Sequence, residues 1–207
     1  MKEFFRYFAL LFVLSIVMSN LSGCGGQAGD TAANAPGSGE TDANANSTEP
    51  KRTSEYPPLA SSLAQADIEM IDGSVIKVAD RKGKVVLLNL WGIWCAPCRA
   101  EMPHLVKMQD EHRDKGFQII GLNVGNEDLE PENIDAMKEF AAEMNLNYEL
   151  ARIPISTTEE FNRVTKFAGV PQTMLIDRDG NLRGVFLGGG KDVIESMVET
   201  VEKVVNE

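Results

Sequence analysis

The chain has 207 residues, with 20 Lys and Arg against 31 Asp and Glu, so its net charge at pH 7 is −11 and its pI is about 4.7. This length suits one globular domain with additional segments, and the negative charge argues against a nucleic-acid partner because the phosphate backbone would be repelled. Three cysteines are too few for a disulfide-stapled scaffold, and two histidines do not complete the four-ligand set of a zinc site, so no metal is predicted.

Residues 1–23 are typical of a secretory signal peptide. Lys2 and Arg6 form a basic start, and the charge-free apolar run Phe8–Met18 is shorter than a membrane-spanning helix. The sequence LSGC at residues 21–24 resembles the bacterial lipobox, which implies cleavage before Cys24 and attachment of lipid to its sulfur. Ordinary secretory cleavage near Ser22 or Gly23, which would leave Cys24 as an unpaired thiol, is the alternative. The lipobox predicts an extracytoplasmic protein that Cys24 anchors to the lipid bilayer of a bacterial membrane.

The next segment has the composition of a flexible tether. Residues 25–58 are almost entirely Gly, Ala, Ser, Thr, Asn, Asp, Glu and Pro, without apolar periodicity. Such a segment buries too little apolar surface to offset the entropy lost on ordering. We therefore predict the lipidated cysteine and a tether over residues 24–58, and a folded domain over residues 59–207.

Strand and helix patterns alternate through the folded domain, which predicts an α/β fold. Asp72-Gly73 lies between two short β-rich runs and indicates a hairpin, and the continuous apolar run Val85–Leu90 indicates a strand buried on both faces. Strands are predicted at 68–71, 75–78, 85–90, 117–124, 148–153, 173–177 and 182–187, and helices at 96–115, 132–145, 158–168 and 191–205.

Cys95 and Cys98 lie where the buried strand 85–90 gives way to a helix. A cysteine at a helix N-terminus meets free N–H groups and the positive end of the helix dipole, which favour the thiolate. Cys95 is therefore the predicted nucleophile of thiol–disulfide exchange, and Cys98, one turn later, is placed to resolve the mixed disulfide. Two unconnected buried thiols, or half of a metal site, are the alternatives.

With the motif WCAPC after a buried strand, the chain resembles the thioredoxin superfamily and, within it, the TlpA-like (ResA-type) branch of membrane-tethered bacterial oxidoreductases. The resemblance covers residues 59–207. It implies a thioredoxin-like fold with a central mixed β-sheet flanked by helices. Relative to thioredoxin, the hairpin at 68–78 is an N-terminal extension and residues 126–153 form a central helix–strand insertion.

The resemblance also implies a substrate surface around the two cysteines. Val170-Pro171 matches the cis-proline loop of the superfamily, in which Pro171 carries the cis bond and Val170 offers backbone groups to an extended substrate peptide. Ala96 and Pro97, between the cysteines, and Trp94, just before them, are expected to contact the substrate.

Glu101 is the predicted proton-transfer residue. Thioredoxin has a buried aspartate in the strand before its motif, whereas this sequence has Asn89, which cannot take a proton. Glu101 matches the glutamate of the TlpA-like pattern WCxPCxxExP, three residues after Cys98, and a partly buried carboxylate there can exchange a proton with the thiol. The alternative is a solvated glutamate that complements the helix dipole. His104 and His112 are expected to be solvated.

The branch suggests a monomeric reductase of extracytoplasmic protein disulfides, with apocytochrome c and its CxxCH sites as a substrate class. A membrane thiol carrier would be the electron donor, and the Cys95–Cys98 disulfide itself would replace any cofactor. A disulfide oxidase or isomerase uses the same chemistry, because the motif does not determine the direction of electron flow. A copper-delivery chaperone is a further alternative, since copper(I) accepts two thiolates. A thiol peroxidase is disfavoured because Ile93 and Trp94 stand where such enzymes need Thr or Ser.

Overall fold

The computed structural model describes residues 54–128 and 130–207, so the predicted signal peptide, Cys24 and nearly all of the predicted tether lie outside the described residues. The strands are β1 (Ile68–Met70), β2 (Val75–Ile76), β3 (Val85–Trp91), β4 (Phe117–Asn123), β5 (Glu149–Arg152), β6 (Gln172–Ile176) and β7 (Leu182–Leu187). The helices are α1 (Ser61–Ala64), α2 (Ala96–His112), α3 (Ile134–Glu143), α4 (Ile155–Thr165) and α5 (Lys191–Val205), with 3-10 turns at Val78–Arg81 and Arg113–Lys115. None of the helices in the described part of the chain is long and apolar enough to cross a membrane.

The strands form one mixed sheet in the order β2-β1-β5-β4-β3-β6-β7. β3 pairs in parallel with β4 and antiparallel with β6, and β5 pairs in parallel with β4. β3 lies inside this sheet, between β4 and β6, and all seven of its residues are buried, as its continuous apolar run predicts. The antiparallel hairpin of β1 and β2 extends the sheet beyond β5, and α3 with β5 forms the predicted insertion.

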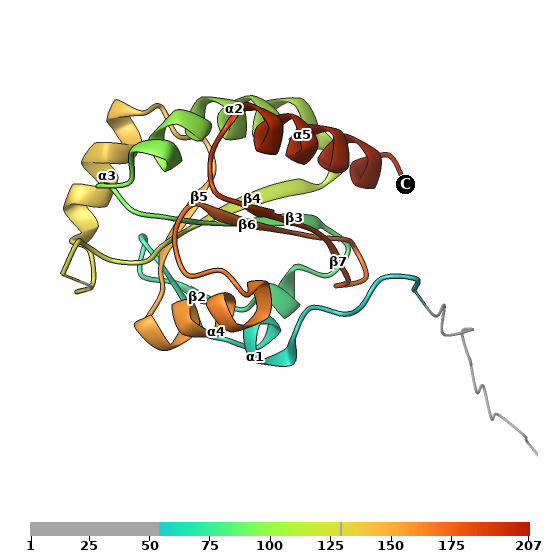
Figure 1. Ribbon diagram of the computed structural model, residues 1–207, viewed down its shortest axis with the longest axis horizontal. Coiled ribbons are helices and arrows are strands. Elements are labelled where there is room, and N and C mark those ends of the chain that lie inside the picture. Colours follow the sequence, from blue (N-terminus) through green and yellow to red (C-terminus); the bar gives the residue numbers. More distant parts are fainter. Residues whose placement is uncertain (1–53, 129) are drawn as a thin grey trace, which may run out of the picture. The chain divides into compact units, whose positions relative to one another are not determined.

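Helices cover both faces of the sheet (Figure 1). α2, α3 and α5 lie on one face, where Leu105 of α2 and Val201 of α5 pack against alternate residues of β3 and β4. α1 and α4 lie on the other face and bury Leu63 and Phe161 against the remaining residues of those strands. Because side chains alternate along β3, Asn89 faces the α2 side with Leu87 and Trp91.

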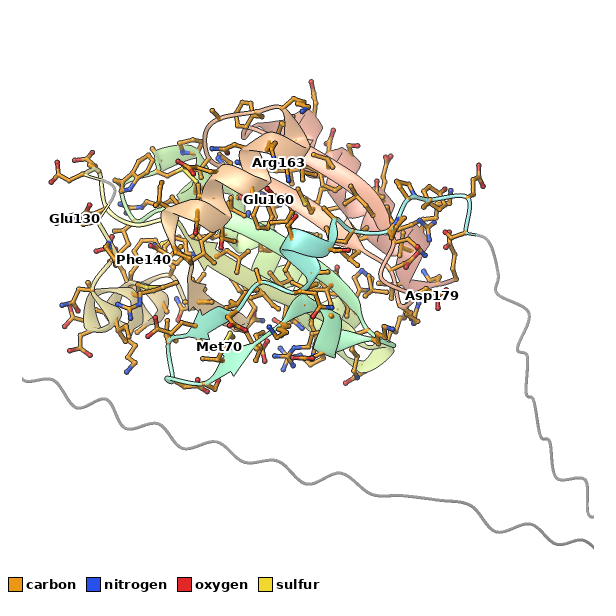
Figure 2. The ribbon with its side chains drawn as sticks, turned by 90° about the horizontal axis from the view of Figure 1, so that it is seen from below. Met70, Glu130, Phe140, Glu160, Arg163 and Asp179 are labelled. Atoms are coloured by element: carbon orange, nitrogen blue, oxygen red, sulfur yellow. A yellow bond between two sulfur atoms is a disulfide. The ribbon has the colours of Figure 1, made fainter. Side chains whose placement is uncertain are left out.

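Two helices begin at other residues than the sequence pattern predicts. α3 begins at Ile134, because the Asn133 side chain caps it by accepting hydrogen bonds from the N–H groups of Asp135 and Ala136. α4 begins at Ile155, directly after Pro154, and ends at Thr165. Figure 2 shows Glu160 and Arg163 close together on α4, where they form an ion pair, and Ser62 of α1 also donates to Glu160.

The first described residues are attached to the start of β7. Pro57 accepts a hydrogen bond from the N–H of Leu182 at 2.8 Å. The Arg183 guanidinium stacks on the ring of Tyr56 at 4.0 Å from its centroid and makes two hydrogen bonds, of 2.6 and 2.8 Å, to the carboxylate of Glu207. Tyr56, in the segment before α1, and Glu207 therefore both contact Arg183.

Candidate active site

A disulfide joins Cys95 and Cys98 at the N-terminus of α2, with the two Cα atoms 5.3 Å apart. Cys95 is the N-cap residue, and its sulfur accepts a hydrogen bond from the N–H of Cys98 at 3.2 Å. Both cysteines are buried in the layer between the sheet and the helices α2 and α3. A negative charge on Cys95 in the reduced protein would thus face a free helix N–H group.

Three of the residues that the sequence predicts for substrate contact are exposed next to the cysteines in the chain. Ala96 and Pro97 are exposed, and Trp94 is 42% exposed although its Nε1 donates a hydrogen bond to the carbonyl of Gly125 at 3.0 Å. The indole folds back over Gly92, where a Cβ atom would come within 2.7 Å of the ring. Glycine at position 92 is therefore required for this orientation of Trp94.

The cis-proline loop lies beside the disulfide, since Val170 packs against the buried cluster that contains both cysteines. The Val170–Pro171 peptide bond is cis, in agreement with the prediction, and the Pro171 carbonyl accepts a hydrogen bond from the N–H of Gly188 at 2.9 Å. Gly189 follows, and a Cβ atom added there would lie 2.9 Å from the Cβ of Pro97. The three-glycine loop at 188–190 thus contacts both the cis-proline loop and the cysteine motif. Sequence reasoning missed this loop, although three consecutive glycines directly after a strand were its signal.

A groove of about 980 Å³ adjoins Pro97 between α2 and α5. Ala100 and His104 of α2 line one wall, and Ile194 and Val198 of α5 line the other. His104 is exposed, as expected, whereas His112 is buried with its ring edge-on to Phe117, so the prediction of a solvated His112 is wrong.

Glu101 is buried on the α2 face of the sheet, next to β3. Its side chain is 2% exposed, and its Oε1 accepts a hydrogen bond of 2.7 Å from Nδ2 of Asn89. The same Nδ2 donates to Oγ1 of Thr173 on β6 at 3.0 Å. The alternative of a solvated glutamate is therefore wrong, because the apolar layer between α2 and the sheet encloses this position.

Burial raises the pKa of Glu101 to about 7, although the hydrogen bond from Asn89 opposes the shift. Burial also raises the pKa of Tyr148, and the negative charge of Glu101 raises it further. A carboxyl with a pKa near 7 can take up and release a proton at neutral pH, which suits acid–base chemistry.

The described residues contain no cluster of three or more His, Cys, Asp or Glu side chains that could hold a metal ion. In the reduced protein, Cys95 and Cys98 are the two thiolates that the copper-delivery alternative would use. The same pair serves thiol–disulfide exchange without a further group.

Known proteins with similar sequences are thiol–disulfide oxidoreductases. A protein named thiol-disulfide oxidoreductase ResA from Bacillus thuringiensis subsp. konkukian is 33% identical over 112 residues, which are 54% of this chain and only 60% of that relative. Its namesake from Halalkalibacterium halodurans is 31% identical over 134 residues, covering 64% of this chain and 68% of the relative.

Solved structures with a similar fold include a thiol–disulfide oxidoreductase. The thioredoxin domain of a thiol-disulfide oxidoreductase from Bacteroides vulgatus superposes with a TM-score of 0.54 at 26% identity, covering 70% of this chain and 99% of that domain. The fold is therefore thioredoxin-like, as predicted. The sequence profile of the Redoxin family matches residues 60–205, which include every strand and helix described above. Because this match covers more than half of its residues, the chain belongs to the Redoxin family.

Proposed function

We propose that this protein is an extracytoplasmic thiol–disulfide oxidoreductase that reduces protein disulfides through the Cys95/Cys98 dithiol. The observation that carries the proposal is the disulfide at the N-terminus of α2, with the cis Val170–Pro171 bond beside it. The names of the relatives support the same chemistry.

In the first step the thiolate of reduced Cys95 attacks one sulfur of the substrate disulfide. A bond forms between Cys95 and that sulfur, the substrate S–S bond breaks, and the other substrate sulfur leaves as a thiolate. The helix N-terminus favours the attacking thiolate. Val170 would align the substrate backbone next to the cis-proline, while Trp94, Ala96 and Pro97 would contact its side chains.

In the second step Cys98 resolves the mixed disulfide. Its thiol loses a proton to Glu101, and the resulting thiolate attacks the sulfur of Cys95, which releases the second substrate thiolate and forms the Cys95–Cys98 disulfide. Two electrons have then moved from the dithiol to the substrate, whose thiolates take protons from solvent. The buried carboxyl with a pKa of about 7 supports Glu101 as the proton acceptor.

The substrate class and the partners follow from the TlpA-like resemblance. The proposed substrates are protein disulfides outside the cytoplasm, with apocytochrome c CxxCH sites as one class, and a membrane thiol carrier would return two electrons to the Cys95–Cys98 disulfide. Lipid on Cys24 would hold the protein at the membrane. The exposed Trp94 and the groove beside Pro97 support a protein substrate.

The direction of electron flow is tested by the reduction potential of the Cys95/Cys98 couple, measured by equilibration with glutathione. We expect a value close to the roughly −270 mV of thioredoxin, together with reduction of a disulfide-bonded CxxCH peptide by the dithiol form. The Cys95→Ser variant is the control and should leave the peptide oxidised. A potential near −120 mV, the value of a strong disulfide oxidant, would show an oxidase instead.

A further inference from the structure

One polar side chain from the sheet holds the carboxylate of Glu101. Nδ2 of Asn89 donates to Oε1 of Glu101 at 2.7 Å and to Oγ1 of Thr173 at 3.0 Å. Within residues 54–128 and 130–207, Asn89 is the only hydrogen-bond donor to this carboxylate. The exposed fractions of Asn89, Glu101 and Thr173 are 0%, 2% and 2%, so solvent does not compete for these hydrogen bonds.

Two neighbouring strands aim the amide of Asn89 at α2. Asn89 and Thr173 are directly opposite each other in the antiparallel pairing of β3 and β6. A side-chain amide has two N–H donors, and Thr173 and Glu101 each accept one of them. Oδ1 of Asn89 is buried without a partner. The orientation of the amide therefore depends on its two N–H bonds, and a rotated amide would bring its oxygen against the carboxylate.

Arg99 of α2 is exposed and lies over the ring of Phe140, and among the described residues no positive charge lowers the pKa of Glu101. Cys98 precedes it by one turn on α2, and Tyr148 packs over Gly121, the residue opposite Asn89 on β4. α3 contributes Met137 and Phe140 to this layer, which are apolar. Asn89 is therefore the group that opposes the effect of burial on Glu101.

We propose that Asn89, anchored by Thr173, is a positioning residue for Glu101, which fixes one carboxylate oxygen against the sheet and keeps the ionised acid available to Cys98. The inference rests on the proposed function of Glu101 as proton acceptor. Without the donor, burial acts alone, and a carboxyl that stays protonated at neutral pH cannot accept the proton of Cys98.

The test is a titration of Glu101 by carbon-13 NMR in the oxidised full-length protein in detergent, where no substrate is needed. Asn89→Leu keeps the size of the side chain and removes the donor. We expect the titration midpoint to rise by about 1–2 pH units, the equivalent of one hydrogen bond to a charged group. Thr173→Val should raise it by less, because Asn89 remains but loses its anchor, and Thr173→Ser should restore the wild-type midpoint.

The matched control is Gln109→Met, which removes a different buried amide, on α2. Gln109 bonds the backbone of β4 at Phe117 and Ile119, through contacts of 3.2 and 2.8 Å, and has no hydrogen bond to Glu101. We expect no shift of the Glu101 midpoint in this variant.

An unshifted midpoint in folded Asn89→Leu would overturn the proposal. If that variant does not fold, Thr173→Val decides in the same way, since an upward shift supports the proposal and an unchanged midpoint overturns it. The pH profile of thiol–disulfide exchange should move upward together with the midpoint. A shifted midpoint with an unmoved exchange profile would uphold Asn89 as the positioning residue and remove Glu101 from proton transfer.

Discussion

Cys95 and Cys98 occupy chemically different positions although only two residues separate them. Cys95 caps α2 and its sulfur accepts the N–H of Cys98, whereas Cys98 lies within the helix and is fully buried. Ala96 and Pro97, which lie between them in the chain, are exposed. This asymmetry supports the proposal that Cys95 attacks the substrate and Cys98 resolves the mixed disulfide.

We expect iodoacetamide to alkylate Cys95 before Cys98 in the reduced protein near neutral pH, because the helix N-terminus favours its thiolate. Peptide mapping by mass spectrometry after a short reaction measures the order of labelling. Cys98→Ser should trap a mixed disulfide with the substrate and thereby identify it. Labelling of Cys98 first would reverse the two roles.

Glu101→Gln removes the proposed base and keeps an oxygen that can accept the hydrogen bond from Asn89. We expect thiol–disulfide exchange at pH 7 to slow by about 10–100-fold, near the low end of general-base effects. Stopped-flow tryptophan fluorescence, with Trp94 as the expected reporter, follows the reaction. An unchanged rate from pH 6 to 8 would leave the proton of Cys98 to water.

The same substitution has a predicted effect on stability. The pKa of Glu101 is about 7 in the folded protein and 4.5 without the fold, so between these values the native state binds more protons than the unfolded state. Stability therefore falls as pH rises from about 4.5 to about 7, by up to about 3 kcal/mol in total. Urea unfolding of the oxidised protein measures this decline, which Glu101→Gln should remove. The same change at exposed Glu139 should leave the decline intact, and parallel wild-type and Glu101→Gln curves would contradict the prediction.

At the scale of elements, the sequence predicts those parts of the fold whose pattern is local. β3 is recognisable because a run of apolar residues can be buried on both faces, and α5 because its apolar residues recur at helical spacing and bury Met197 and Val201. The starts of α3 and α4 are less predictable, because an asparagine cap and a proline decide them within one residue.

In the candidate site, too, the sequence predicts the residues of local motifs but not the contacts between distant parts of the chain. The sequence motif around the cysteines gives Cys95, Cys98 and Glu101, and the separate match at Val170-Pro171 gives Pro171. Neither gives the pairing of Asn89 with Thr173, since that hydrogen bond depends on the register of two strands and joins residues that are 84 positions apart in the chain. The contact of the 188–190 loop with Pro97 is non-local for the same reason.

Gly189→Ala tests how closely this loop must approach the cysteine motif. The added methyl group would lie 2.9 Å from Cβ of Pro97, so the loop or the start of α2 must move. We expect exchange with a protein disulfide to slow by about 10-fold or more while the fold is retained, because small displacements of a reacting group are costly. Gly73→Ala, in the distant hairpin, controls for general destabilisation. Equal exchange rates in Gly189→Ala and wild type would show that this contact is not needed for activity.

At the scale of the whole molecule, deletion of residues 25–54 should leave the rate of exchange with a soluble model disulfide unchanged within about twofold. The deleted segment contains no thiol or other candidate catalytic group, and the contacts of Tyr56 and Pro57 with β7 remain. Loss of activity in a folded protein would place part of the active domain within the predicted tether.

The proposed anchor is tested separately by Cys24→Ala. Wild type should fractionate with membranes and incorporate labelled fatty acid, whereas the variant should appear as a soluble or unprocessed protein. Absence of lipid from the wild-type protein would indicate ordinary secretion.

The length of β7 separates the contact of Pro57 with Leu182, where the N-terminal segment meets the domain, from the reactive sulfurs. The chain joins the domain beside Leu182, and the loop that touches Pro97 follows Leu187, so the two points are about one six-residue strand, roughly 20 Å, apart. A domain held close to a bilayer at the first point would present its sulfurs away from the lipid. The domain would have to turn over to reach the proposed thiol donor in that bilayer. It would not have to turn over to reach the proposed extracytoplasmic substrate. We therefore expect tether length to limit the rate of re-reduction more than the rate of substrate reduction.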